Sequence, residues 1–216
     1  MLEPLVLSAK LALITTLLIP LAAAPLAYVL AFRRFPGKSL LDALVSLPMV
    51  LPPTVLGFAL LLAMRPQGAL GGTWESLTGQ RLVFSFTGIV LASLVYNLPF
   101  AVQPLRTAFE KLDPRLLEAS AVLGLSPLRT FFRVVLPCSL PGLAAASVLV
   151  FAHSLGEFGV ILMVGGSIPG STKVAAIAIY EAVEAMRYND ALMICLALVP
   201  VSFAALVAIN SMNGRR

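Results

Sequence analysis

The chain has 216 residues, of which 59% are hydrophobic and only 12% are charged, and its mean hydropathy is +0.97. An ordinary soluble domain carries about 25% charged residues, so this composition argues against a soluble enzyme and against a disordered chain. The net charge of +5 comes from basic residues spaced between long apolar runs, which indicates a membrane protein rather than a nucleic-acid-binding protein.

Five runs of the sequence contain no Asp, Glu, Lys or Arg and are long enough to cross a membrane as helices. The hydrocarbon core of a bilayer is about 30 Å thick, which a helix of about 20 residues spans. We therefore predict a single domain over residues 1–216, an all-α integral membrane protein with five transmembrane helices. The predicted helices cover residues 11–32, 43–64, 82–105, 138–156 and 191–210.

Several prolines fall inside these predicted spans, where neighbouring helices can satisfy the carbonyl groups that proline leaves free. We expect kinks that either shape a pathway or are merely tolerated. The prolines are Pro20, Pro25, Pro48, Pro52, Pro53, Pro99 and Pro104. A further charge-free run, residues 158–172, is too short to span a bilayer, and its length is typical of a re-entrant or interfacial segment.

The distribution of basic residues predicts the orientation of the chain. Five spans place the two termini on opposite sides of the membrane. One side carries 10 of the 15 basic residues, namely Arg33, Arg34, Lys38, Arg106, Lys111, Arg115, Arg129, Arg133, Arg215 and Arg216. Loops rich in Lys and Arg stay in the cytoplasm. We therefore predict an external N-terminus, a cytoplasmic C-terminus and a cytoplasmic loop over residues 106–136.

This loop contains the start and stop signals of two short helices. Asp113-Pro114 is typical of an N-cap followed by proline in the first helical position, and Gly124 of a left-handed cap at the helix end. Ser126-Pro127 repeats the start signal. The second helix has an apolar face, formed by Leu128, Phe131, Phe132 and Val135. From periodicity alone, two arrangements of this loop are equally favoured. It could form a knob that projects from the membrane, or it could lie on the lipid headgroups.

The same loop resembles the EAA loop of binding-protein-dependent ABC importer permeases. The matching residues, in register, are Glu118-Ala119-Ser120, Gly124 and Val134-Val135-Leu136-Pro137. Ser120 and Val134 depart mildly from the family pattern, which has Ala and Ile there. In that family the loop forms a coupling helix that docks on the ATP-binding subunit. The resemblance implies that this contact is shaped by Glu118, Ala119, Ser120, Gly124, Leu136 and Pro137.

A second stretch resembles the molybdate permeases of this family. It comprises Phe-Ala-His-Ser-Leu-Gly-Glu-Phe-Gly at 151–159 and Gly-Gly-Ser-Ile-Pro-Gly-Ser-Thr at 165–172. Sulfate and tungstate permeases share the Gly-Glu-Phe/Val-Gly core, whereas the Ser-Ile-Pro-Gly-Ser-Thr continuation is closer to the molybdate type. The expected function is therefore a permease for an oxyanion, molybdate in the first place, with sulfate or tungstate as the alternative.

The resemblance also implies partners and a location. The expected assembly is a homodimer in the bacterial inner membrane, with the pathway between the two copies. Two ABC ATP-binding subunits would bind on the cytoplasmic side, and a periplasmic binding protein would deliver the oxyanion. The permease itself would hydrolyse no ATP, would contact the lipid bilayer and would bind no nucleic acid.

Polar side chains in or beside the predicted spans are candidates for a pathway or an outer gate: Thr54, Asn97, His153, Ser154 and Glu157. Ionisable residues inside a membrane are functional candidates by default. A metal site usually needs three or four ligands, and the chain has no second histidine, so we expect no metal, no cofactor and no catalytic residue. Instead, we expect His153 to line a helix contact, and Glu157 to end the fourth span and bond to the backbone of the following turn.

Two alternatives come from other function classes. One is an intramembrane enzyme that uses His153 and Glu157, which stand four residues apart. The other is a non-catalytic membrane scaffold whose cytoplasmic loop binds a different partner. For the transporter, the absence of a basic residue at mid-membrane in the sequence predicts a weak or transient anion site, built from neutral donors or water.

Overall fold

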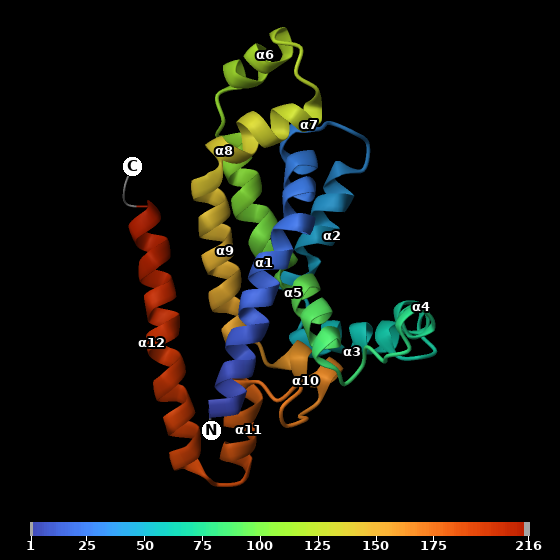
Figure 1. Ribbon diagram of the computed structural model, residues 1–216, viewed down its shortest axis with the longest axis vertical. Helices are drawn as coiled ribbons and strands as arrows, with labels where there is room; N and C mark the ends of the chain where they lie inside the picture. Colours follow the sequence, from blue (N-terminus) through green and yellow to red (C-terminus); the bar gives the residue numbers. More distant parts are fainter. Residues whose placement is uncertain (1, 214–216) are drawn as a thin grey trace.

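The computed structural model describes residues 2–213, and all regular secondary structure in that range is helical (Figure 1). The arginines of the predicted cytoplasmic tail, Arg215 and Arg216, lie outside the described residues. The helices are α1 Leu2–Phe32, α2 Lys38–Val50, α3 Pro53–Met64, α4 Ala69–Thr78, α5 Phe86–Glu110, α6 Pro114–Val122, α7 Pro127–Thr130, a π-helical segment Phe131–Val135, α8 Leu136–Cys138, α9 Leu140–Leu155, α10 Gly159–Gly165, α11 Ala175–Glu184 and α12 Tyr188–Asn213.

Helices α1, α5 and α9 form the centre of the bundle, with α12 packed on the outer side of α9 (Figure 1). They share a hydrophobic cluster that includes small residues of α1, Ala23 and Ala27, which let the helix backbones approach closely. Phe109 of α5 and Leu30 of α1 close the core at the end where α6 and α7 lie, which we call the coupling end. The opposite end holds α11 and the N-terminus.

Two helices, α1 and α5, are long and apolar enough to cross a membrane on their own. Two bent pairs reach that length only together: α2 with α3, and Pro127–Cys138 with α9. The described residues therefore contain two to four candidate spans by length and composition, and the shorter apolar helix Tyr188–Ala204 lies within α12. The fold is thus an all-helical integral membrane bundle, as the composition predicts.

The predicted span over residues 43–64 is not one straight helix. It bends by 112° between α2 and α3. Leu51 and Pro52 adopt extended backbone conformations, with ψ of 139° and 134°. Each of them precedes a proline, whose ring disfavours the α-helical conformation in the residue before it. The Pro52-Pro53 pair therefore breaks the helix, and α3 turns away beside α10 (Figure 1).

The charge-free run 158–172 forms the short helix α10 and a tight loop after it. Inside this loop Ile168 donates its backbone N–H to Thr172 Oγ1, which in turn donates to the Gly165 carbonyl at 2.7 Å. Glu181 of α11 accepts hydrogen bonds from Lys173 Nζ and Ser167 Oγ, and these two donors lower the pKa of its carboxyl below the usual value. The loop is thereby fastened to α11.

Gly142 lies at a close approach of α9 to α5, because a Cβ there would lie 2.3 Å from the Cβ of Ala108. We predict that Gly142→Ala lowers the free energy of unfolding by about 1–3 kcal/mol, because one helix must shift to admit the methyl group. Thermal unfolding in detergent measures this loss. Gly156→Ala is the control, since the nearest atom to a Cβ there is the His153 carbonyl oxygen at 3.9 Å. Equal effects of the two variants would contradict the packing argument.

Candidate coupling helices and candidate pathway site

Helices α6 and α7 lie beyond the ends of α1, α5 and α9, where they form a knob on the bundle (Figure 1). Asp113 caps α6, because its side chain accepts the backbone N–H of Arg115 at 2.9 Å, and Pro114 occupies the first turn. Ser126 accepts the N–H of Arg129 at 3.4 Å and is followed by Pro127. Both helix starts that the sequence predicts are confirmed.

Gly124 ends α6 in the left-handed conformation, with φ of +69°. The N–H of Leu125 donates to the Ser120 carbonyl and the N–H of Gly124 to the Ala121 carbonyl, each at 3.0 Å. This pair of bonds is the Schellman arrangement, which satisfies the last carbonyl groups of a helix. An L-residue is strained at this φ, so glycine fits here because it has no Cβ.

The residues that the EAA resemblance singles out fall into two structural groups. Glu118, Ala119, Gly124 and Pro137 are exposed, and Leu136 is half-buried. Ser120 is buried: its Oγ donates to the Leu117 carbonyl and pairs with the Thr130 hydroxyl at 3.2 Å. Ser120 therefore joins α6 to α7, and Thr130 is its partner, which sequence reasoning missed.

Three large apolar side chains of the knob are strongly exposed. Val122 is 87% exposed, Leu123 77% and Leu128 68%. Large apolar side chains exposed in one short segment, away from the bundle core, are typical of a protein-binding surface. We call Val122, Leu123 and Leu128 the apolar cap.

A second candidate site lies where α9 gives way to α10. Glu157 is only 4% exposed, and its Oε2 accepts hydrogen bonds from Ser93 Oγ at 2.8 Å and from Asn97 Nδ2 at 3.3 Å. Glu157 thus has side-chain donors on α5 rather than the backbone donors that we expected. No described residue donates to the other carboxyl oxygen, Oε1.

Asn97 connects Glu157 to His153. Its Nδ2 donates to Ser93 as well as to Glu157, so its Oδ1 faces His153 Nδ1 at 3.0 Å. Oδ1 can only accept, which assigns a proton to Nδ1 of the imidazole. Phe100 stacks on the His153 ring, with 4.0 Å between centroids. His153 therefore does line a helix contact, between α9 and α5.

A pocket of about 520 Å³ opens beside this network. Three of the five candidate pathway residues line it: Thr54, His153 and Glu157. Asn97 is fully buried and hydrogen-bonded to two of them, whereas Ser154 is buried but does not belong to the lining. The sequence did not single out two lining residues: Tyr96, which lies in an apolar helix, and Phe158, which lies in the motif at 151–159 without being picked as a site residue. No group of three His, Cys, Asp or Glu in the described ranges could hold a metal ion.

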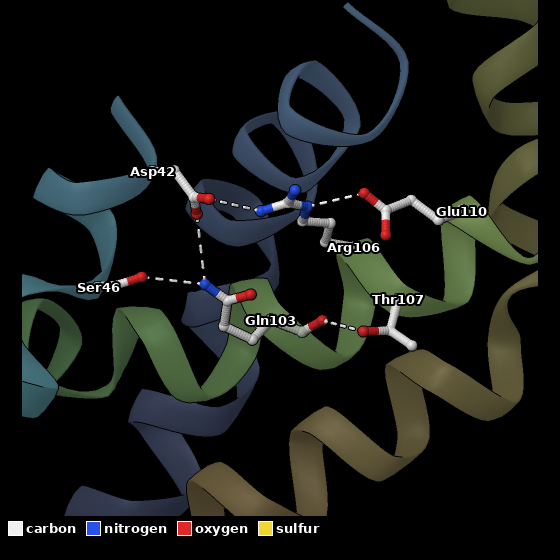
Figure 2. A network of polar contacts seen from close by, with 6 residues as sticks. All are labelled: Asp42, Ser46, Gln103, Arg106, Thr107 and Glu110. Carbon is white, nitrogen blue, oxygen red and sulfur yellow. Dashed lines mark hydrogen bonds and ion pairs between the residues drawn. The ribbon is translucent and has the colours of Figure 1, made fainter. Parts of the chain in front are cut away.

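A charged network joins α2 to α5 near the coupling end (Figure 2). Arg106 donates from Nη1 to Asp42 Oδ2 and from Nε to Glu110 Oε1, each at 2.8 Å. Gln103 Nε2 donates to Ser46 Oγ at 3.0 Å and lies 3.5 Å from Asp42 Oδ1. The sequence places these residues in different predicted elements and gives no signal for the contact.

Arg106 is the centre of this network, so its removal leaves two carboxylates without their cation. We predict that Arg106→Gln lowers the free energy of unfolding by about 1–2 kcal/mol, because the pairs are only partly shielded from solvent. Melting temperatures in detergent at low and high salt measure the effect, which should shrink at high salt. Asp42→Asn, which leaves the pair of Arg106 with Glu110, should cost less. A larger cost for Asp42→Asn would contradict this assignment.

Comparisons with known proteins agree with this architecture. Residues 23–213 match the model of the family "Binding-protein-dependent transport system inner membrane component". The chain is 46% identical to the molybdenum transport system permease protein ModB of Azotobacter vinelandii, over 95% of this chain and 91% of that protein. It is 36% identical to a probable sulfate transport system permease protein cysT of Nephroselmis olivacea, over 92% and 70% of the two chains.

The fold itself also occurs in a solved transporter. A crystal structure of a bacterial ABC transporter involved in the import of alginate superposes with a TM-score of 0.77, at 18% identity, over 99% of this chain and 79% of that chain. The family match sets aside the enzyme and scaffold alternatives, and it confirms the importer family that the EAA loop predicts. The chain therefore belongs to the binding-protein-dependent inner membrane components, as a multi-pass, non-catalytic permease subunit of an ABC importer.

Proposed function

We propose that this permease carries an oxyanion, molybdate in the first place, across the bacterial inner membrane. The observation that carries the proposal is the 46% identity to a molybdenum permease along 95% of the chain, against 36% for a sulfate permease. Sulfate and tungstate are the alternative substrates, since they are similar tetrahedral dianions.

Two copies of the chain form the working unit, with the pathway between them and one ATP-binding subunit under each knob. When the ATP-binding subunits close on ATP, they move the two knobs and switch the pathway between its inward and outward openings. A periplasmic binding protein delivers the anion from outside. The exposed positions of Glu118 and Ala119 on α6 and of Gly124 just after its end, beside the apolar cap in the sequence, support the knob as the docking element.

Five membrane crossings are needed for this arrangement, by the segments predicted from the sequence: α1, α2 with α3, α5, α9 and α12. The chain is then one transmembrane domain, with the N-terminus outside and the coupling end in the cytoplasm. The basic residues of the knob, Arg115, Arg129 and Arg133, support this orientation because positive loops stay inside. Thr54, Asn97, His153, Ser154 and Glu157 belong to the pathway or its outer gate.

Labelling of single cysteines tests the orientation. In a chain whose Cys138 and Cys195 are replaced by serine, Leu77→Cys would add one exposed thiol on α4, which lies away from the coupling end, and Arg115→Cys one on α6, at that end (Figure 1). A membrane-impermeant maleimide applied to spheroplasts should label Leu77→Cys alone. Labelling of Arg115→Cys from outside would overturn the orientation and the docking site together.

Uptake with competing anions tests the substrate. The permease, its ATP-binding subunit and its binding protein should restore radiolabelled molybdate uptake in cells that lack their own molybdate importer. Excess unlabelled molybdate should abolish this uptake, and equal excess sulfate should leave most of it. Uptake of labelled sulfate in preference to molybdate would replace the substrate while keeping the transporter assignment.

A further inference from the structure

The carboxyl of Glu157 is buried without a cation. Ser93 and Asn97 donate to one of its oxygens, and both donors are neutral. The other oxygen, Oε1, has no donor among the described residues, although Glu157 lines the 520 Å³ pocket. No ion pair of Glu157 occurs within the described part of the chain. A buried charge is usually paired, so an ionised Glu157 would be an expensive exception.

Among the described residues, those that line the pocket with Glu157 carry no fixed positive charge. Helix α5 contributes Tyr96, and α9 contributes His153, whose Nδ1 is bound to Asn97. The other lining side chains do not titrate: they are Pro53 and Thr54 of α3, Ala152 of α9, Gly156 and Phe158 at the break, and Gly159 of α10. Helix α11 adds Tyr180, which contacts Phe158. His153 and Tyr96 are thus the only titratable neighbours that line the pocket with Glu157.

In a pathway that carries an oxyanion, an ionised and unpaired Glu157 would be unfavourable for a second reason. A dianion beside an unpaired negative charge in a low-dielectric site is repelled strongly. A protonated carboxyl has the opposite effect, because it carries one O–H donor and no charge. If Oε2 keeps its two donors, the proton sits on Oε1, the oxygen that has no donor.

Building on the proposed function, we propose that the pocket is an oxyanion subsite of the pathway, in which neutral Glu157 donates a hydrogen bond from Oε1 to the transported anion. The Thr54 hydroxyl and the Tyr96 phenol are further neutral donors in the lining. The volume of the pocket lies within the usual range of small-molecule sites, about 300–1,000 Å³. Ionisation of Glu157 would convert the subsite from a donor to a repelling charge.

Glu157→Gln tests this inference because it fixes the neutral form. The amide oxygen can accept from Ser93 and Asn97, and the amide nitrogen can then donate where Oε1–H would. The complete transporter, with its ATP-binding and binding proteins, is reconstituted in liposomes, and molybdate uptake is measured between about pH 6 and pH 9. We expect Glu157→Gln to retain molybdate uptake at low pH, where its amide replaces the O–H donor. The ratio of variant to unmodified uptake should then rise with pH, by up to about tenfold per unit once the carboxyl ionises.

The control is Glu75→Gln, the same change at a glutamate of α4 that pairs with exposed Arg81 outside the pocket. Its uptake ratio should stay constant with pH, since the partner subunits are identical in all samples. Loss of molybdate uptake in Glu157→Gln at every pH would overturn the inference, because it would show that the carboxylate is required. A ratio of Glu157→Gln uptake to unmodified uptake that does not change with pH would also overturn the inference.

Infrared spectroscopy gives a readout that needs no transport. The unmodified complex, with ¹³C-labelled glutamate, should show a protonated carboxyl band at neutral pH that Glu157→Gln lacks. A pure carboxylate spectrum would overturn the inference even if the variant failed to assemble. Failure of the proposed function looks different: the unmodified transporter would then import no oxyanion at any pH.

Discussion

Replacing Leu123 by aspartate is expected to prevent the ATP-binding subunit from docking while leaving the permease folded. Leu123 is 77% exposed at the end of α6, so the folded chain loses little packing when it changes. In the proposed docked complex the same position would become buried, and an unpaired carboxylate there would be costly. A central apolar contact of an interface contributes about 2 kcal/mol or more, which corresponds to a roughly 30-fold loss of affinity.

The matched control for this change is Leu77→Asp. Leu77 is 79% exposed on α4, which lies away from the coupling end (Figure 1). Both variants are purified in detergent and titrated with the ATP-binding subunit, and their melting temperatures are compared. We expect Leu123→Asp alone to lose binding and transport, with both variants melting close to the unmodified chain. Docking that survives Leu123→Asp would place the ATP-binding subunit elsewhere and remove the apolar cap from the mechanism.

The knob could be predicted from sequence because its structure is determined by neighbouring residues. The caps at Asp113 and Ser126 and the left-handed glycine at 124 each depend on bonds within five residues, so local chemistry fixes them. The resemblance of this loop to the EAA loop then predicts the partner of the knob, which is the ATP-binding subunit. Ser120 shows the limit of this reasoning, since its place in the motif does not reveal that it faces Thr130 instead of a partner protein.

For the candidate pathway site, the sequence predicted which polar side chains could take part but not which of them contact one another. Ser93 and Glu157 are 64 positions apart, and Asp42 and Arg106 are also 64 apart, so no local pattern records either contact. The Pro52-Pro53 pair is recognisable in the sequence as a helix breaker. The hydropathy of residues 43–64, however, does not predict that α3 turns toward α10. That turn brings Thr54 to the wall of the pocket, which explains why the site depends on the three-dimensional path of the chain.

Replacing Asn97 by aspartate is expected to cause the largest loss of stability in the pathway site. Asn97 is fully buried, and its amide nitrogen donates to Ser93 and to Glu157. Aspartate removes these donors and places a second carboxyl 3.3 Å from Oε2 of Glu157. Each buried polar atom left unsatisfied costs about 1–3 kcal/mol, so we expect a total of about 2–4 kcal/mol and a melting temperature lower by about 5–15 °C.

A second substitution separates this contact from general disruption of the core. In the double variant Asn97→Asp with Glu157→Gln, the amide of Gln at 157 can donate to the new carboxyl, which reverses the direction of the original hydrogen bond. We expect the double variant to regain at least half of the lost stability, so that the two changes are strongly non-additive. Additive losses would mean that Asn97 and Glu157 do not share a hydrogen bond. The proton of Glu157 is assigned to Oε1 because Oε2 accepts from Ser93 and Asn97, so additivity would also remove the physical basis for Glu157 as a donor to the transported anion.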